Sequence, residues 1–244
     1  MSSVDRNQPL GTPTWVDLAV PDLERAREFY GRVFGWEFDG GDCLLRGLPV
    51  AGLRQAGPDE GSHGWDVHLA TEDVDASAAA VTAAGGALLV EPHDVAGRGR
   101  AAFAVDPTGA RFGLWSGRGF PGCRLVNEPD TLVRNDLLTP AAAKARDFYC
   151  AVFGFTLDGN NDLPGADFTF LRRPDGHEVG GIFGAPGATV SAWATTFEVA
   201  DADATVAKAV AAGGTAQPAE PTPYGRMATI TDPFGTEFTA IARG

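Results

Sequence analysis

The sequence predicts an α+β fold made of two tandem copies of one domain, each built from two strand–helix–three-strand modules. Three observations support this fold class. The two halves of the chain carry the same blocks of residues in the same order. Within each half, short strand-like segments alternate with amphipathic helical segments. The length of 244 residues suits two domains of ordinary size, and a hydrophobic content of 44% is enough for two cores.

An internal repeat is the strongest of these observations. The segment WVDLAVPDLERAREFYGRVFGWEFD (15–39) returns as RNDLLTPAAAKARDFYCAVFGFTLD (134–158), which aligns Asp17 with Asp136. Two further blocks repeat downstream: WDVHLATEDVDASAAAVTAAGG (65–86) as WATTFEVADADATVAKAVAAGG (193–214), and GRAAFAVDPTGARF (99–112) as GRMATITDPFGTEF (225–238). The chain is therefore a fused duplication. We expect domains at 12–116 and 131–243, joined by a linker at 117–130 that is rich in Gly, Pro and polar residues.

The residues of the first half predict an order of strands and helices that the second half repeats. A strand at 14–20 precedes a helix that begins after Pro21, because the residue before a proline disfavours helix, and Gly35 ends this helix. Asp73 or Asp75 is expected to cap a second helix, which Gly85-Gly86 ends. The other strands are expected at 36–39, 42–47, 49–55, 65–71, 87–91, 100–105 and 110–115, with a tight turn at 106–109.

Charge and cysteine content exclude several classes of partner. A formal net charge of −13 would repel nucleic acid and anionic membranes. No apolar stretch is long enough to span a membrane, and the first residues lack the apolar core of a signal peptide, so we expect a cytoplasmic protein. The three cysteines form no CxxC motif, which argues against a disulfide framework and a thiolate zinc site.

Three blocks together resemble the vicinal-oxygen-chelate superfamily of glyoxalases, bleomycin-resistance proteins and dioxygenases. They are WVDLAVPDLERAREFYGRVFGW, WDVHLATEDVDA…AAGG and GRAAFAVDPTGARFGLW, and all three recur in the second half. The nearest subtype is the tandem two-domain glyoxalase-like proteins that are often labelled hydroxylases. The resemblance implies paired βαβββ modules that curl around a pocket. The superfamily includes lactoylglutathione lyase, extradiol dioxygenases, fosfomycin-modifying enzymes and drug-sequestering proteins.

The resemblance also implies where a metal would bind. Metal-dependent members hold a divalent ion with His, Glu or Gln on the first, fourth, fifth and eighth strands. The matching residues here are Trp15 and Arg134, Gly52 or Leu53 and Gly181 or Ile182, Val67 and Thr195, and Gly113 and Thr239. None of these is a usual ligand, and a guanidinium repels a cation. We therefore expect no metal cofactor. The alternative is a divalent metal on displaced ligands such as His68; the other histidines are His63, His93 and His177, and none of the four recurs in the other half.

A pocket without a metal would be lined by the residues that alternate with these positions along each strand. Asp17 and Asp136 are the repeated inward carboxylates and the candidate catalytic acids or bases, with a structural role as the alternative. His68 is expected to face the helix-covered side of the sheet, and Arg100 and Arg226 to lie on the surface. The expected ligand-binding residues form an apolar and aromatic wall: Trp15, Trp65, Val67, Trp115, Arg134, Trp193, Thr195, Phe197 and Thr239.

These residues favour a metal-independent protein that binds or sequesters an apolar or aromatic metabolite or antibiotic, and that transforms it, if at all, by aspartate acid–base chemistry. The alternative is a metal-dependent lyase or dioxygenase with displaced ligands; a third hypothesis is a regulatory pseudo-enzyme with a collapsed pocket. Any enzymatic activity would be that of a lyase or an oxidoreductase. The duplication supplies internally the interface that single-domain relatives form by dimerising, so we expect a monomer of pseudo-dimeric domains, with a homodimer as the alternative. Whether modules pair within or between domains is left open.

Overall fold

The computed structural model describes residues 2–57, 64–159 and 165–244. The first domain consists of two βαβββ modules in chain order. The first module comprises β2 (Pro13–Val20), α1 (Leu23–Phe34), β3 (Glu37–Asp39), β4 (Asp42–Leu45) and β5 (Leu48–Gln55). The second comprises β6 (Asp66–Ala70), α2 (Val74–Ala83), β7 (Ala87–Val95), β8 (Gly99–Val105) and β9 (Arg111–Gly117).

The second domain repeats this order. Its first module comprises β11 (Leu132–Thr139), α3 (Ala142–Phe153), β12 (Thr156–Gly159), β13 (Phe168–Arg172) and β14 (Glu178–Gly184). Its second comprises β15 (Ala192–Glu198), α4 (Ala202–Ala211), β16 (Thr215–Ala216), β17 (Glu220–Thr222), β18 (Gly225–Thr231) and β19 (Glu237–Ala242). Two short strands, β1 (Ser2–Ser3) and β10 (Leu125–Val126), pair with each other, and β10 also pairs with β11. Thus the expected linker contributes one strand to the second sheet.

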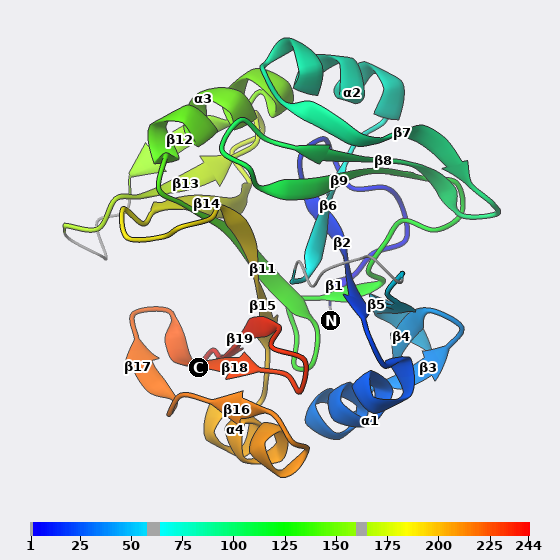
Figure 1. Cartoon of the computed structure of the whole chain (residues 1–244), viewed down its shortest axis with the longest axis vertical. Helices are drawn as coiled ribbons and strands as arrows, with labels where there is room; N and C mark the ends of the chain where they lie inside the picture. The colour runs from blue at the N-terminus through cyan, green and yellow to red at the C-terminus, as the bar shows by residue number, and fades with distance from the viewer. Residues whose placement is uncertain (1, 58–63, 160–164) are drawn as a thin grey trace.

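Each domain has one curled mixed sheet (Figure 1). The first sheet has the order β3-β4-β5-β2-β6-β9-β8-β7, and the main path of the second is β12-β13-β14-β11-β15-β19-β18-β16. The first strands of the two modules, β2 with β6 and β11 with β15, pair antiparallel at the centre of each sheet. The modules therefore pair within a domain, and the expected α+β class with curled sheets is confirmed.

Local sequence signals fix the helix ends. The Asp22 side chain caps α1 by accepting a hydrogen bond from the Arg25 N–H at 3.0 Å, and Gly35 ends this helix in the left-handed conformation at φ 71°. Asp73, the first of the two candidate residues, caps α2 in the same way. The apolar face of α1 is buried, including Phe29, Tyr30 and Val33. These capping and burial patterns are those expected from the sequence.

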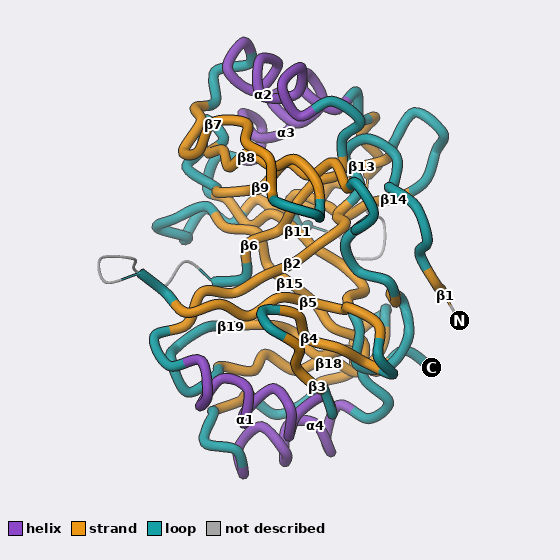
Figure 2. The backbone as a smooth tube through the Cα atoms, turned by 90° about the vertical axis from the view of Figure 1, so that its right-hand side faces the viewer, coloured by secondary structure: helices purple, strands orange, loops and turns teal. Residues whose placement is uncertain are grey.

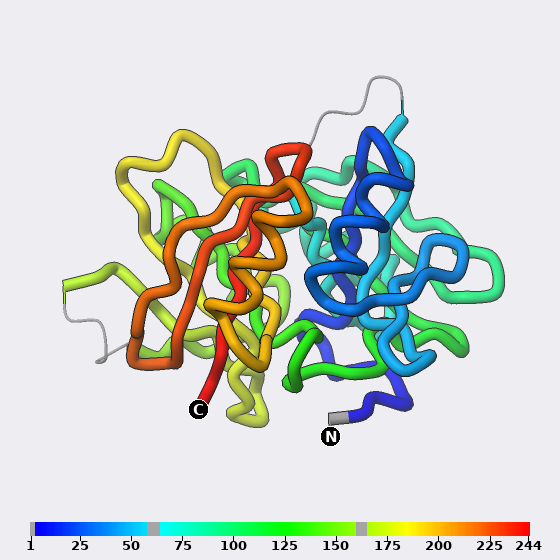
Figure 3. The backbone as a smooth tube through the Cα atoms, turned by 90° about the horizontal axis from the view of Figure 1, so that it is seen from below, coloured from blue at the N-terminus to red at the C-terminus, as the bar shows by residue number. Residues whose placement is uncertain are grey.

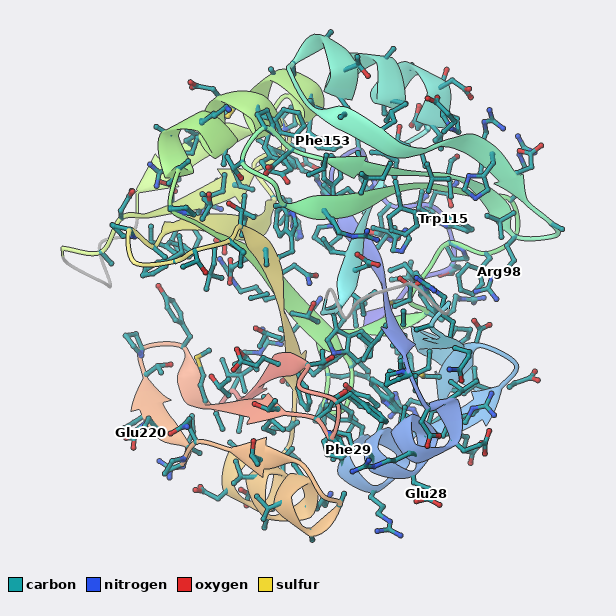
Figure 4. The ribbon with its side chains drawn as sticks, viewed as in Figure 1. Glu28, Phe29, Arg98, Trp115, Phe153 and Glu220 are labelled. Atoms are coloured by element: carbon teal, nitrogen blue, oxygen red, sulfur yellow. The ribbon has the colours of Figure 1, made fainter. Side chains whose placement is uncertain are left out.

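Each helix of one domain packs against a helix of the other domain, on the side of the sheets away from the pockets. Helices α1 and α4 lie together at one end of the molecule and α2 and α3 at the other, with the strands between them (Figure 2). A Cβ atom at Gly214 would lie 2.8 Å from the Phe29 ring, and one at Gly86 would lie 3.0 Å from the Phe148 ring. Helices α1 and α3 thus each press an aromatic ring onto a glycine of the other domain. Figure 4 labels Phe29 on α1 and Phe153 on α3. Seen from below, the two domains lie side by side (Figure 3).

Among the described residues, no helix combines the length and the apolar character that a membrane crossing needs. The three cysteines are free, with Cys43 and Cys123 buried and Cys150 half-buried. This agrees with the absence of a disulfide framework expected from their spacing.

Two candidate pockets inside the curled sheets

The first pocket lies inside the first sheet and has a volume of about 250 Å³. Its aromatic lining comes from β2, β8, β9 and the segment after β9: Trp15, Phe103, Trp115 and Phe120. The Phe120 ring meets the Trp15 ring edge to face at 5.0 Å. Figure 4 labels Trp115 and Arg98, which lie on β9 and in the β7–β8 turn, on the same side of the molecule. The guanidinium of Arg98 stacks 3.5 Å from the Phe120 ring centre and bonds Asp42 at 2.8 Å.

Asp17 and His68 form a carboxylate–imidazole pair in this pocket. His68 Nε2 lies 3.0 Å from Asp17 Oδ1. The imidazole is buried, with 6% of its side chain exposed, whereas 22% of the Asp17 side chain is exposed. The ring edge of His68 packs on Phe103 at 5.0 Å. The carboxylate is therefore the member of the pair that a ligand can reach.

The orientation expected for β6 is wrong, and the register of the strands explains why. Trp15 lies opposite His68 across the β2–β6 pair. Directly opposed residues of an antiparallel pair point to the same face. His68 therefore faces the pocket and Val67 the helix-covered side. Strand β15 shows the same register, because Arg134 lies opposite Thr196 rather than Thr195.

Five residues expected to bind ligand lie in the hydrophobic core instead. The Trp65 ring packs against Tyr30 at 5.4 Å and against Phe197 at 5.2 Å, and Trp193 donates a hydrogen bond to the Tyr149 hydroxyl at 3.0 Å. The Thr195 hydroxyl accepts a hydrogen bond from Asn135 at 2.9 Å. The alternating residues Trp65, Val67, Trp193, Thr195 and Phe197 are buried on the face of each sheet that packs against the helices. The expectation that this face lines the pocket is wrong for these five residues.

The second pocket lies inside the second sheet and has a volume of about 450 Å³. Its apolar lining comes from β13, β14, β18, β19 and the turn after β17: Phe168, Phe170, Phe183, Tyr224, Met227 and Ile241. The repeat does not predict these aromatic residues, because the first half has Asp42 where the second has Phe170, and Arg54 where the second has Phe183. Thr196 lines this pocket, whereas Thr239, which lies opposite it on β19 and was the expected ligand-binding residue, is not among the lining residues.

An arginine with two carboxylate partners forms the polar part of this pocket. Arg134 Nε bonds the two Asp136 oxygens at 2.7 and 2.9 Å, and Nη1 bonds Glu178 at 2.5 Å. Burial raises the pKa of Asp136, and the charge and hydrogen bond of Arg134 oppose that rise. Arg134 Nη2 is buried with no hydrogen-bond partner in the described part of the chain. The guanidinium also lies over Phe168 and Phe170 at 5.7 and 5.3 Å from the ring centres.

His93 lines the first pocket, whereas the remaining charged residues singled out from the sequence lie away from the two aromatic pockets. Arg100 pairs with Asp75 at 2.7 Å, and its counterpart Arg226 pairs with Asp203 at 2.5 Å, both on the surface as expected. His177 is exposed in the β13–β14 turn, where its backbone N–H donates to Asp175. His63 lies outside the described residues.

The residues present do not fit the divalent metal of the superfamily. In the second pocket the Arg134 guanidinium occupies the first-strand position and holds Asp136. In the first pocket Asp17 and His68 bond each other, and the flanking strands present Gly52 and Gly113. Across residues 2–57, 64–159 and 165–244, no group of three or more His, Cys, Asp or Glu side chains could hold a metal ion. A stable divalent site usually needs at least three protein ligands.

Sequence comparisons show relatives along nearly the whole chain. The Mycobacterium bovis protein named "Putative glyoxylase CFP32" is 39% identical over 247 residues, which cover 95% of this chain and 94% of that protein. The Streptomyces peucetius "Anthracycline biosynthesis protein DnrV" is 34% identical over 257 residues, covering 95% and 93%.

Solved structures share the fold at lower identity. The Mn(II)-bound glyoxalase from Novosphingobium aromaticivorans is 22% identical with a TM-score of 0.69, and the alignment covers 95% of this chain and 82% of that one. The 2,3-dioxygenase LapB from Pseudomonas sp. KL28 is 17% identical with a TM-score of 0.65, covering 97% and 94%. The model of the Glyoxalase/Bleomycin resistance protein/Dioxygenase superfamily matches residues 131–239, and that of the Bleomycin resistance protein-like N-terminal family matches 12–41. With two βαβββ domains and relatives of this kind over its full length, the chain belongs to the glyoxalase/bleomycin resistance protein/dioxygenase superfamily.

Proposed function

We propose that the chain binds a flat, apolar aromatic small molecule in the second-domain pocket. The observation that carries this proposal is a cavity of about 450 Å³ walled by three phenylalanines, a tyrosine, a methionine and an isoleucine. Pockets for small organic ligands occupy roughly 300–1,000 Å³ and combine such walls with a few polar groups. Flat rings stack well on aromatic side chains.

The polar group of the pocket indicates where the ligand carries oxygen. Arg134 lines the pocket, and its Nη2 is a buried donor with no hydrogen-bond partner among the described residues. Such a donor is costly unless a ligand or water satisfies it. A carbonyl or phenolic oxygen at one edge of the ring system would accept this hydrogen bond. The relative named for anthracycline biosynthesis supports a polycyclic aromatic ligand of this kind. In this arrangement Asp136 positions Arg134 and is not free to transfer a proton.

A matched pair of variants tests this proposal, with 1,8-dihydroxyanthraquinone as the probe. Phe170 lines the pocket, whereas Leu157 is 45% exposed on the neighbouring β12 and lies outside it. We expect Phe170→Ala to weaken binding by about tenfold, because a stacked ring contributes on the order of 1 kcal/mol beyond its buried area. Leu157→Ala should bind like the natural protein. Calorimetric titration measures both, and equal affinities for the two variants would refute the proposal.

We further propose that binding needs no metal. The support is the donor set, in which an arginine stands at the first-strand position of the second pocket. The alternative is a metal-dependent lyase or dioxygenase that uses Asp17 and His68 as displaced ligands, which their shared orientation into one pocket favours. Metal analysis of the purified protein separates the two. Stoichiometric Fe, Mn, Ni or Zn that is lost in Asp17→Asn and His68→Gln would establish the alternative.

A further inference from the structure

We propose that the first-domain pocket is a second ligand site, in which the Asp17 carboxylate accepts a hydrogen bond from the hydroxyl of a one- or two-ring phenol. His68 is the positioning residue that fixes the carboxylate. This site is separate from the second-domain pocket, so it stands or falls independently of the function proposed there.

The two equivalent aspartates differ in how their oxygens are used. Asp136 accepts two hydrogen bonds from the Arg134 guanidinium, which balances its charge inside the protein. Asp17 has Trp15 where Asp136 has Arg134, and its one hydrogen-bond partner in the described part of the chain is the His68 imidazole, bonded to Oδ1. Asp17 lines the pocket, and no hydrogen bond to its Oδ2 is found among the described residues. An acceptor with spare capacity at a cavity wall is a group that a ligand donor can use.

Two glycines on the flanking strands create the space for this pair. A Cβ atom at Gly113 of β9 would lie 2.2 Å from His68 Nδ1, and one at Gly52 of β5 would lie 2.9 Å from both the Asp17 and the Trp15 side chains. In the second domain, where Thr196 replaces His68, the residue opposite it is Thr239. The first domain is therefore shaped around the imidazole. The imidazole also packs edge to face against Phe103, with ring centroids 5.0 Å apart.

The lining determines the class of ligand. Trp15, Trp115, Phe103 and Phe120 provide faces and edges for a flat ring, and a volume of about 250 Å³ suits one or two rings. Two carboxylates, two guanidiniums and two imidazoles line the same cavity: Asp17, Asp42, Arg54, Arg98, His68 and His93. An ammonium group would therefore gain little net attraction, whereas a neutral hydroxyl can donate to Asp17 at no charge cost. Arg98 already bonds Asp42 and stacks on Phe120, so it does not compete for the hydroxyl.

The test uses three probes that differ in one group: 4-nitrophenol, its methyl ether 4-nitroanisole, and 4-nitrobenzylamine. Calorimetric titration of the full chain should rank the phenol first. Because a carboxylate acceptor favours the protonated phenol, binding should also bleach the yellow 4-nitrophenolate absorbance at a pH where the free probe is half ionised. Equal binding of the phenol and the ether, a preference for the amine, or increased phenolate absorbance would each overturn the proposal, and none of these readouts depends on a variant that folds.

Variants then assign the residues. Asp17→Asn should weaken 4-nitrophenol binding by about tenfold, because it replaces a charge-assisted hydrogen bond with a neutral one. Asp39→Asn is the matched control, because Asp39 is an exposed carboxylate on β3 outside both pockets, and it should leave this binding unchanged. His68→Gln keeps a donor near the Nε2 position and should retain most of the affinity and the bleaching, whereas His68→Leu should lose both. If His68→Leu behaves like His68→Gln, His68 has no positioning role.

Discussion

Replacing Gly113 tests most directly whether this glycine makes room for the His68 imidazole. It lies opposite His68 on the neighbouring strand, and an added Cβ would approach His68 Nδ1 to 2.2 Å. Its backbone is not in the left-handed region, so the cost of Gly113→Ala is steric. We expect the free energy of unfolding to fall by about 1–3 kcal/mol, as for other overpacked sites. In a His68→Thr background, which copies only the Thr196 member of the Thr196–Thr239 pair, most of that loss should disappear.

Urea denaturation of the single and double variants measures this coupling. Gly159→Ala is the control: Gly159 also lies in a strand outside the left-handed region, and an added Cβ there would meet no described residue within 4 Å. It should change the stability by less than about 0.5 kcal/mol. If Gly113→Ala costs the same with and without His68, the glycine does not make room for the imidazole.

The same residues show why the pocket lining was only partly predictable. The repeat and the alternation of side chains placed Trp15, Asp17, Trp115 and Arg134 on the pocket face, where the structure has them. His68 was assigned to the wrong face because its orientation depends on which residue of β2 lies opposite it. That register shifts at an irregularity between Pro13 and Trp15, and nothing local in the sequence indicates it.

Among the helices, α3 lacks the cap that the other three have. Asp22, Asp73 and Asp201 each accept a hydrogen bond from a first-turn backbone N–H at 3.0 Å, whereas Ala141 at the start of α3 has no side-chain cap. We expect Ala141→Asp to raise the free energy of unfolding by about 0.5–1 kcal/mol. The gain should lie at the low end, because ψ at Ala141 is 50° rather than the 99° of Asp22.

Denaturation midpoints of Ala141→Asp and Asp22→Ala check this prediction as a pair. The second variant should lower the stability by about 1 kcal/mol, since it removes a cap that is present. A loss of stability in Ala141→Asp would mean that the backbone there cannot reach the capping conformation.

The helix ends can be predicted from the sequence because caps and stop signals are local. The extent of β7 could not be predicted in this way. The sequence predicts a strand over 87–91, but β7 spans Ala87–Val95 because its pairing with β8 continues along the hairpin.

At the scale of the whole molecule, two tyrosines join the domains reciprocally. The Tyr30 hydroxyl on α1 donates to Asp232 Oδ2 in the β18–β19 turn of the other domain at 3.0 Å. Its counterpart Tyr149 on α3 packs against Phe112 of the first domain at 5.7 Å. The sequence repeat aligns Tyr30 with Tyr149 but does not show that each one crosses to the other domain, because that depends on how two separate sheets dock.

The Tyr30–Asp232 bond should make the stability depend on pH in a defined direction. Burial raises the pKa of Asp232, and the hydrogen bonds that it accepts, including the one from Tyr30, oppose that rise. A carboxyl whose pKa is higher in the folded state loses stabilising free energy as the pH rises from its unfolded value of about 3.9 through its folded value. Tyr30→Phe removes a donor to the ionised form, so it should cost about 1–3 kcal/mol at neutral pH and clearly less near the unfolded pKa, where Asp232 is protonated. Urea denaturation at both pH values measures the difference, with Leu157→Ala, at a leucine that is 45% exposed, as the control that should change little at either. An equal cost of Tyr30→Phe at the two pH values would mean that the tyrosine contributes packing between the domains but does not stabilise the charge of Asp232.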